Sequence, residues 1–235
     1  CAKRQTAEAL WQLGQRIKEV YLKTMGERDA GILATMVVGD REFLDAETKR
    51  LYQIGGLSHI LAISGLHISV IGMALYRMLK KAGLPFGMAA LAAAGVMYGY
   101  GGMAGWGVSV RRAVLMFLLF LGAQVSGRSY DTFCALAFAT VTLLWKNPCL
   151  LWDAGFRFSF VAILGVVWVG QSISYEKKGI GARRGKIFAA SAVWFTTLPL
   201  VAWYFYEIPL FAFLPNLFAG AVMTAVLLTG AAGLL

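Results

Sequence analysis

Two histidines and a serine lie close together where the first long apolar segment begins. His59 and His67 are eight residues apart, with Ser64 between them and further hydroxyls at Ser58 and Ser69. Polar and ionisable groups at the head of a membrane-spanning helix are costly to expose to lipid, so they usually face a bundle interior or a water-filled cavity. We therefore expect His59, Ser64 and His67 to face protein or water.

The spacing of these side chains argues against a metal or catalytic centre. Two histidines eight positions apart lie about 80° apart around an ideal helix, and no carboxylate follows either by three or four residues to complete a zinc site. Hydrogen bonding between helices is the favoured role for the imidazoles. Ser64 lacks the Gly-x-Ser-x-Gly turn that presents a nucleophilic serine. We expect no catalytic residue, no metal and no cofactor, and a membrane enzyme is the weakest interpretation.

Arginines near the start of two later apolar segments offer a second clue. Arg111 and Arg112 begin the third segment, and Arg157 lies near the head of the fifth. Each could reach toward lipid headgroups, and Arg157 could pair with Asp153. Alternatively, they could form a positive funnel for a polyanion. For Arg111 we favour the headgroup interpretation, whereas both stay open for Arg112 and Arg157.

The composition is that of a membrane protein. Hydrophobic residues make up 59% of the chain and charged residues 14%, whereas about a quarter of a soluble domain is charged. Apolar runs long enough to cross a bilayer follow one another. We expect an all-α, polytopic transmembrane bundle of about seven spans, at residues 57–79, 85–103, 109–126, 132–146, 154–174, 187–206 and 211–235.

Residues 1–55 differ from this apolar remainder. Hydrophobic residues recur at helical spacing from Leu10 to Tyr21, with charged side chains on the other faces. A second apolar stretch, from Ile32 to Val38, is too short to cross a bilayer. We therefore divide the chain into amphipathic helices at 1–55, which lie at the membrane surface or cap the bundle, and a transmembrane domain at 56–235.

A cluster of glycines interrupts the second predicted span. Five of the nine residues from Gly99 to Gly107 are glycine. So many glycines disfavour a continuous helix, and unwound backbone at membrane depth is tolerated only against protein or water. We expect a broken segment or a re-entrant turn in this part of the chain.

The net charge of +10 is distributed unevenly among the predicted connections. Loops on one side hold nine basic residues, namely Arg77, Lys80, Lys81, Arg128, Lys177, Lys178, Arg183, Arg184 and Lys186. The opposite connections hold four, namely Arg111, Arg112, Lys146 and Arg157. Because cytoplasmic loops of membrane proteins retain an excess of Lys and Arg, residues 1–55 are expected outside the cytoplasm.

The stretch from Gly56 to His67 closely resembles the signature of the ComEC competence family, inner-membrane proteins that pass transforming DNA into bacteria. Gly39-Asp40 also looks like the start of its competence domain, and Arg112-Ala113 with Met116 is similar to its Arg-Ala-x-x-Met span. Further similar positions are Asn147-Pro148, Asp153, Gly155-Phe156, Ser159-Phe160, Ala162, Pro199, Phe205 and Asn216-Leu217. Two positions depart from the family pattern, because Arg157 stands where Gln is usual and Gly220-Ala221 where a Pro is expected.

The resemblance implies a multi-pass inner-membrane channel for single-stranded DNA. Relatives usually carry an OB-like domain before this region and often a metallo-β-lactamase-like nuclease after it, so the chain is expected to be part of a longer protein whose other domains are partners. Further expected partners are the lipid bilayer, a DNA-delivery protein outside and a helicase inside. The predicted path residues are His59, Ser64, His67, Arg112, Arg157 and Asn216. A secondary transporter of a small anion is the alternative.

The charge asymmetry makes the topology testable. In a chain whose native cysteines are replaced by serine, Lys23→Cys should react with an impermeant thiol reagent added to intact cells. Gly181→Cys, within the most basic loop, should be protected until the cells are opened. Labelling of position 181 in intact cells, with position 23 protected, would reverse the topology.

Overall fold

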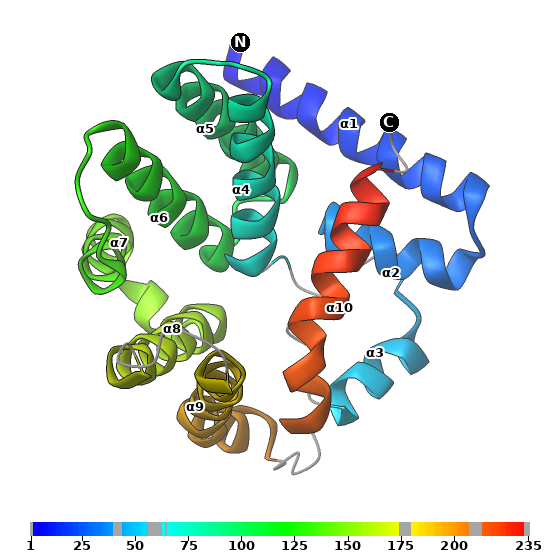
Figure 1. The fold of residues 1–235 in the computed structure, drawn as a ribbon. Helices are drawn as coiled ribbons and strands as arrows, with labels where there is room; N and C mark the ends of the chain where they lie inside the picture. Colours follow the sequence, from blue (N-terminus) through cyan, green and yellow to red (C-terminus); the bar gives the residue numbers. More distant parts are fainter. Residues whose placement is uncertain are drawn as a thin grey trace. The chain divides into compact units, whose positions relative to one another are not determined.

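The computed structural model describes residues 2–39, 44–55, 63, 65–173, 180–206 and 213–232 (Figure 1). Ten α-helices and one 3-10 turn make up the regular structure of these residues, and no strand occurs among them. The expected all-α class is therefore confirmed. The chain divides into two compact units, a first unit of Cys1–Tyr130 with Gly220–Leu235 and a second unit of Asp131–Ala219.

The first unit begins with three helices, α1 (Ala2–Thr24), α2 (Glu27–Val37) and α3 (Ala46–Ile54). The Nε of Arg28 on α2 donates to the Thr48 hydroxyl on α3 at 3.0 Å. The buried Tyr21 hydroxyl of α1 donates to the Gly230 carbonyl at 3.3 Å, on the part of α10 (Phe213–Ala232) that belongs to this unit. The amphipathic pattern of residues 1–55 thus corresponds to helices that pack on their own unit.

Helix α1 lies against the glycine-rich end of α5 (Phe86–Met103). A Cβ on Gly102 would be 2.8 Å from the Leu10 side chain, and a Cβ on Gly14 would be 3.0 Å from Val38 and 3.4 Å from Met103. Each helix therefore offers a glycine to the side chains of the other. This exchange brings the two backbones close together.

The expected break across residues 99–107 is wrong in its first half. Helix α5 continues through Gly99, Gly101 and Gly102 and ends at Met103. The chain reverses only afterwards, where Gly105 and Trp106 have φ values of +75° and +51°. Helical glycines here provide room for neighbouring side chains instead of breaking the helix, since a Cβ on Gly101 would be 3.0 Å from the Trp106 ring.

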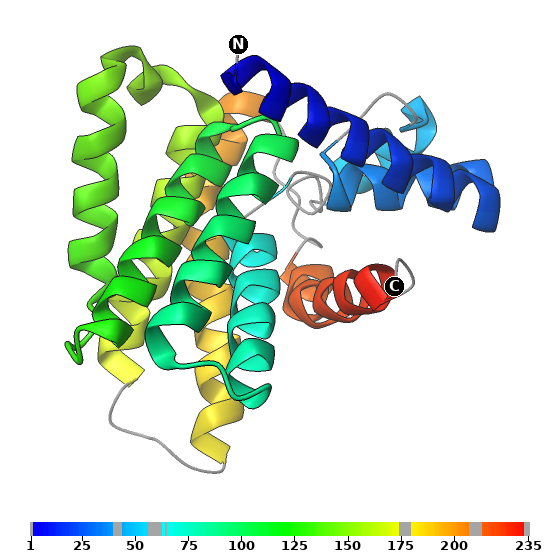
Figure 2. The same ribbon diagram turned by 90° about the horizontal axis from the view of Figure 1, so that it is seen from above.

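Three helices form the core of the first unit, α4 (Gly65–Lys81), α5 and α6 (Val108–Val125), which lie side by side in Figure 1 and in the turned view of Figure 2. Apolar side chains from all three are buried between them, among them Ile68, Met97, Val114, Phe117 and Leu121. Helices α4 and α6 run in parallel, because Gly65 faces Arg112 and Gly72 faces Phe117. A Cβ on Gly72 would be 2.7 Å from that ring, so only glycine permits this separation.

The second unit contains α7 (Thr132–Lys146), η1 (Pro148–Trp152), α8 (Ala154–Ile173) and α9 (Ile180–Phe205). Helices α8 and α9 are antiparallel, because Phe158 contacts Tyr204 whereas Gly165 contacts Thr196. Asp131 caps α7 by accepting a bond from the Cys134 amide at 2.7 Å, and this bond lowers the pKa of the Asp131 carboxyl. Capping of this kind satisfies an amide at the helix start that has no intrahelical partner.

All seven predicted apolar segments coincide with helices, α4 to α10 in order. Residues 57–62 and 64 of the first segment lie outside the described part, and α9 begins seven residues before the predicted 187. Within the described residues, one helix, Val108–Val125, is both long and apolar enough to cross a membrane by length and composition. Shorter apolar helices lie at Thr132–Lys146, Ala154–Trp168 and Ser191–Phe205, so the count of seven spans stays a prediction.

Two glycines with different surroundings are predicted to respond in opposite ways to substitution by alanine. Gly72 lies in the contact between α4 and α6, and Gly95 lies outside it. Gly72→Ala should destabilise the protein by about 1–3 kcal/mol, because its methyl group overlaps the Phe117 ring. Gly95→Ala on α5, where no atom lies within 4 Å of an added Cβ, should instead stabilise the helix by about 0.5–1 kcal/mol. Thermal unfolding of the detergent-solubilised variants measures both, and equal midpoints would contradict the proposed contact.

Candidate functional site

Two of the predicted path residues are buried on one pair of packed helices. His67 on α4 has an exposed fraction of 0% and Arg112 on α6 one of 5%. The expectation that His67 faces protein is therefore confirmed, whereas His59 and Ser64 lie outside the described residues. Arg157 belongs to the second unit, and the Asn216 side chain is also outside the described part.

The Arg112 guanidinium occupies space that is free because Gly65 has no side chain. A Cβ on Gly65, the first described residue of α4, would be 2.9 Å from Nη2 of Arg112 and 3.6 Å from the Ala113 methyl group. The guanidinium also donates from Nη1 to the Met116 sulfur, 3.7 Å away and one helical turn later. We call Gly65, Arg112 and Met116 the arginine seat.

The arginine seat joins two sequence motifs that are separated by more than 40 residues. Gly65 comes from the Ser-Gly-Leu-His motif, and Arg112, Ala113 and Met116 form the Arg-Ala-x-x-Met motif. The small residues let the helices approach closely, and the thioether is a weak, polarizable acceptor. Sequence reasoning selected Arg112 but missed Gly65 as a partner, although a glycine beside a serine at the head of an apolar segment was the available signal.

Burial of Arg112 places a fixed positive charge between apolar helices. A guanidinium stays charged throughout the physiological pH range, and moving a charge away from water is costly unless other groups compensate. Arg112 also lies in the second turn of α6, near the end at which the helix dipole is positive. The guanidinium and the helix dipole thus both contribute positive potential at this end of α6, which favours an anion over a cation.

Arg157 has different surroundings, on the surface of the second unit. Its guanidinium carbon lies 4.8 Å from the centroid of the Trp152 ring, and its Nε donates to the Leu151 carbonyl at 2.8 Å. Asp153 accepts a bond from the Phe156 amide at 2.8 Å and so caps α8. No salt bridge joins the described Asp153 and Arg157 side chains, so Asp153 acts as a cap and Arg157 packs on Trp152.

Other motif positions in the second unit have local structural roles. Asn147 accepts a bond from the Cys149 amide at 3.1 Å and caps η1, with Pro148 at its first position. Phe156 and Phe160 are buried, and their stacked rings have centroids 4.0 Å apart. These residues fix the turn between α7 and α8 and thereby position Arg157.

The fold and the arginine seat describe an all-helical protein with a buried cation between apolar helices. The sequence matches the family described as "Competence protein" over residues 36–235, and the chain belongs to this family. It is 26% identical over 201 residues to ComE operon protein 3 of Bacillus subtilis and 28% identical over 196 residues to competence protein ComA of Neisseria gonorrhoeae. It is also 29% identical over 162 residues to recombination protein 2 of Haemophilus influenzae.

These alignments cover most of this chain but only a fraction of each relative. The alignment with the Bacillus subtilis protein covers 86% of this chain and 26% of that relative. The corresponding values are 79% and 27% for the Neisseria gonorrhoeae protein, and 63% and 20% for the Haemophilus influenzae protein. The chain therefore spans between a fifth and about a quarter of the length of these three curated relatives. No solved structure matches the fold significantly. The family resemblance predicted from the Gly56–His67 stretch is confirmed.

The cap at the start of α8 predicts how Asp153 tolerates substitution. Asp153→Ala should lower stability by about 0.5–2 kcal/mol, because the Phe156 amide loses its acceptor. Asp153→Asn should be close to wild type, since an amide oxygen caps nearly as well as a carboxylate. Chemical denaturation of both variants provides the measurement. Equal losses for Asn and Ala would show that the negative charge, rather than the cap, is what the protein requires.

Proposed function

We propose that this chain forms the transmembrane part of a channel that passes single-stranded DNA across the bacterial inner membrane during natural transformation. Membership of the competence family supports a role in DNA uptake. The structural observation that carries the proposal is the arginine seat, which holds a permanent cation inside a bundle of apolar helices. Such a charge suits a polyanion that must leave water.

The proposed channel consists of α4 to α10 as membrane spans. Described side chains in the middle of these helices are large, apolar and exposed, including Leu91 on α5, Val141 on α7 and Phe195 on α9. A chain in water rarely leaves so many such residues uncovered, whereas lipid would cover them. The multi-pass arrangement and the seven spans belong to this proposal.

The proposed mechanism is passive guidance of the phosphate backbone. A hydrated, polar and positive path offsets the cost of bringing phosphates into a low-dielectric layer. The path is assigned to His59, Ser64, His67, Arg112, Arg157 and Asn216, with Ser64 and His67 helping to shape its mouth. The sequence contains no phosphate-binding loop, so the driving force is assigned to a cytosolic helicase, with a DNA-delivery protein outside and other domains of the full-length protein assisting. The chain itself is proposed to have no enzymatic activity.

The arginine seat predicts that DNA uptake depends on both of its helices. In the full-length protein of a transformable bacterium, Arg112→Ala should lower transformation by at least about tenfold, equivalent to about 1.4 kcal/mol in the barrier to uptake. Gly65→Ala should act in the same direction, because its methyl group would displace the guanidinium. Arg157→Gln should have only a modest effect, because that side chain packs on Trp152.

Protein abundance in the membrane has to be matched for this comparison. Gly87→Ala, where an added Cβ meets no atom within 4 Å, is the control for the glycine substitution. Undiminished transformation by Arg112→Ala at normal abundance would refute the role of the seat. Oligonucleotide and small-anion uptake by the purified protein in vesicles would separate a DNA channel from the transporter alternative, since only a channel for DNA should admit the oligonucleotide.

A further inference from the structure

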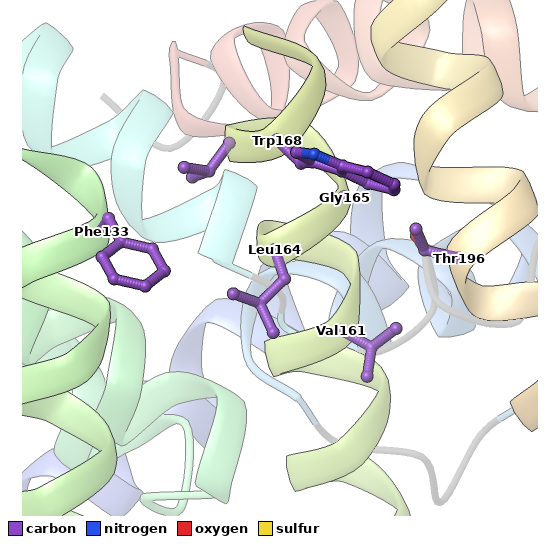
Figure 3. A pocket seen from close by; sticks show the side chains of 7 residues that line it. Phe133, Val161, Leu164, Gly165, Trp168 and Thr196 are labelled. Atoms are coloured by element: carbon purple, nitrogen blue, oxygen red, sulfur yellow. The ribbon is translucent and has the colours of Figure 1, made fainter. Parts of the chain in front are cut away.

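An apolar groove runs along α8 in the second unit, between α7 and α9. Its volume is about 440 Å³. Figure 3 shows Phe133 of α7 on one side, Thr196 of α9 on the other and side chains of α8 between them. Its lining includes Phe133, Val161, Leu164, Gly165, Trp168 and Thr196. Most of these side chains cannot form hydrogen bonds.

Gly165 lies where α8 and α9 approach each other at the side of the groove. A Cβ at this position would be 2.5 Å from the Thr196 hydroxyl and 3.2 Å from the Ala192 carbonyl, so the glycine permits close contact of α8 and α9. The Thr196 hydroxyl donates to the Ala192 carbonyl at 2.7 Å. This bond lies within α9 and gives the Thr196 hydroxyl a partner on its own helix.

A cation lies at one end of the same face of α8. Five residues lie on one stripe of α8, because successive members are mostly three or four positions apart. They are Arg157, Val161, Leu164, Gly165 and Trp168. Arg157 precedes Gly165 by eight residues, or about 12 Å of helix. Trp152, on which the guanidinium packs, is 75% exposed. The stripe therefore has a cation and an exposed indole at its head, aliphatic side chains along its middle, and Trp168, also 75% exposed, at its far end.

This order matches the change in polarity across one leaflet of a bilayer. Tryptophan and arginine are favoured at the level of the headgroups, and aliphatic side chains below them. Exposed residues of the neighbouring helices follow the same order. On α7, Trp145 and Lys146 lie at the end next to η1, whereas Phe138 and Val141 lie further in. On α9, Trp203 lies near the end next to Trp152, with Tyr206 directly after the helix, whereas Phe195 lies further in.

We infer that the groove binds a phospholipid, with an acyl chain along the α8 stripe and the headgroup phosphate at Arg157. The inference rests on the membrane location in the proposed function. A hydrocarbon chain needs no hydrogen-bond partners, whereas the backbone of a bound peptide would need partners that this lining does not supply. The guanidinium at the head of the stripe matches the charge of a phosphate. The lipid fills the space between α7 and the α8–α9 pair.

Native mass spectrometry of the purified full-length protein tests this site. The protein is released from bilayers of phosphatidylethanolamine and phosphatidylglycerol into mild detergent, and bound lipid is counted on each molecule. Wild type should retain one phospholipid. Leu164→Trp, which fills the groove, should reduce retention at least fivefold, and Arg157→Gln should reduce it several-fold. Leu91→Trp, at an exposed apolar residue of α5, and Arg128→Gln, at an exposed arginine of the first unit, are matched controls that should retain the lipid.

Circular dichroism establishes that each variant keeps its helical content, so loss of lipid is not mistaken for loss of fold. Retention of the same amount by Leu164→Trp and wild type would overturn the groove as the site. Loss of lipid in Leu164→Trp but not in Arg157→Gln would overturn the assignment of the phosphate to Arg157. A protein dimer in place of a lipid adduct would show that a second copy covers the groove, which also overturns the inference. The assay needs no DNA, so failure of the DNA-uptake proposal would leave its outcome readable.

Discussion

The close approach of two parallel helices, α4 and α6, is the constraint on which the first unit depends. Gly65 and Gly72 lie two turns apart on α4, and each faces a large side chain of α6. One glycine admits the Phe117 ring into the core, and the other admits the Arg112 guanidinium. Packing of the core and placement of the buried charge therefore both depend on glycines of α4 that face α6. A change in the separation of these two helices would alter the core and the candidate site together.

Glycine has the same role elsewhere in the protein. Gly14 and Gly102 bring α1 against α5, and Gly165 brings α8 against α9. Association of helices in lipid depends on close contact, because lipid and apolar side chains differ little in polarity. The chain contains 27 glycines. Gly101 and Gly102 within α5 make room for side chains of neighbouring residues and do not interrupt the helix.

The two arginines of the candidate path have different surroundings and, on our proposals, different partners. Arg112 is buried between α4 and α6, where we propose that its charge acts on the DNA backbone. Arg157 packs on the exposed Trp152 indole at the head of an apolar groove, a position suited to a lipid headgroup. Asn147 and Asp153 support this second arrangement by capping η1 and α8. The motif residues of this chain thus include structural caps as well as candidates for function.

The sequence by itself determined the helical class, the positions of seven apolar helices and the family, because run length, hydropathy and motif spacing are local properties of the chain. It also selected Arg112 and His67, since a charge or an imidazole in an apolar segment is conspicuous. Only the tertiary structure decided that Gly65 accommodates Arg112, that Asp153 caps a helix instead of pairing with Arg157, and that α5 continues through its glycines. These outcomes depend on which side chain a second helix or turn brings within a few ångströms, and no local pattern contains that information.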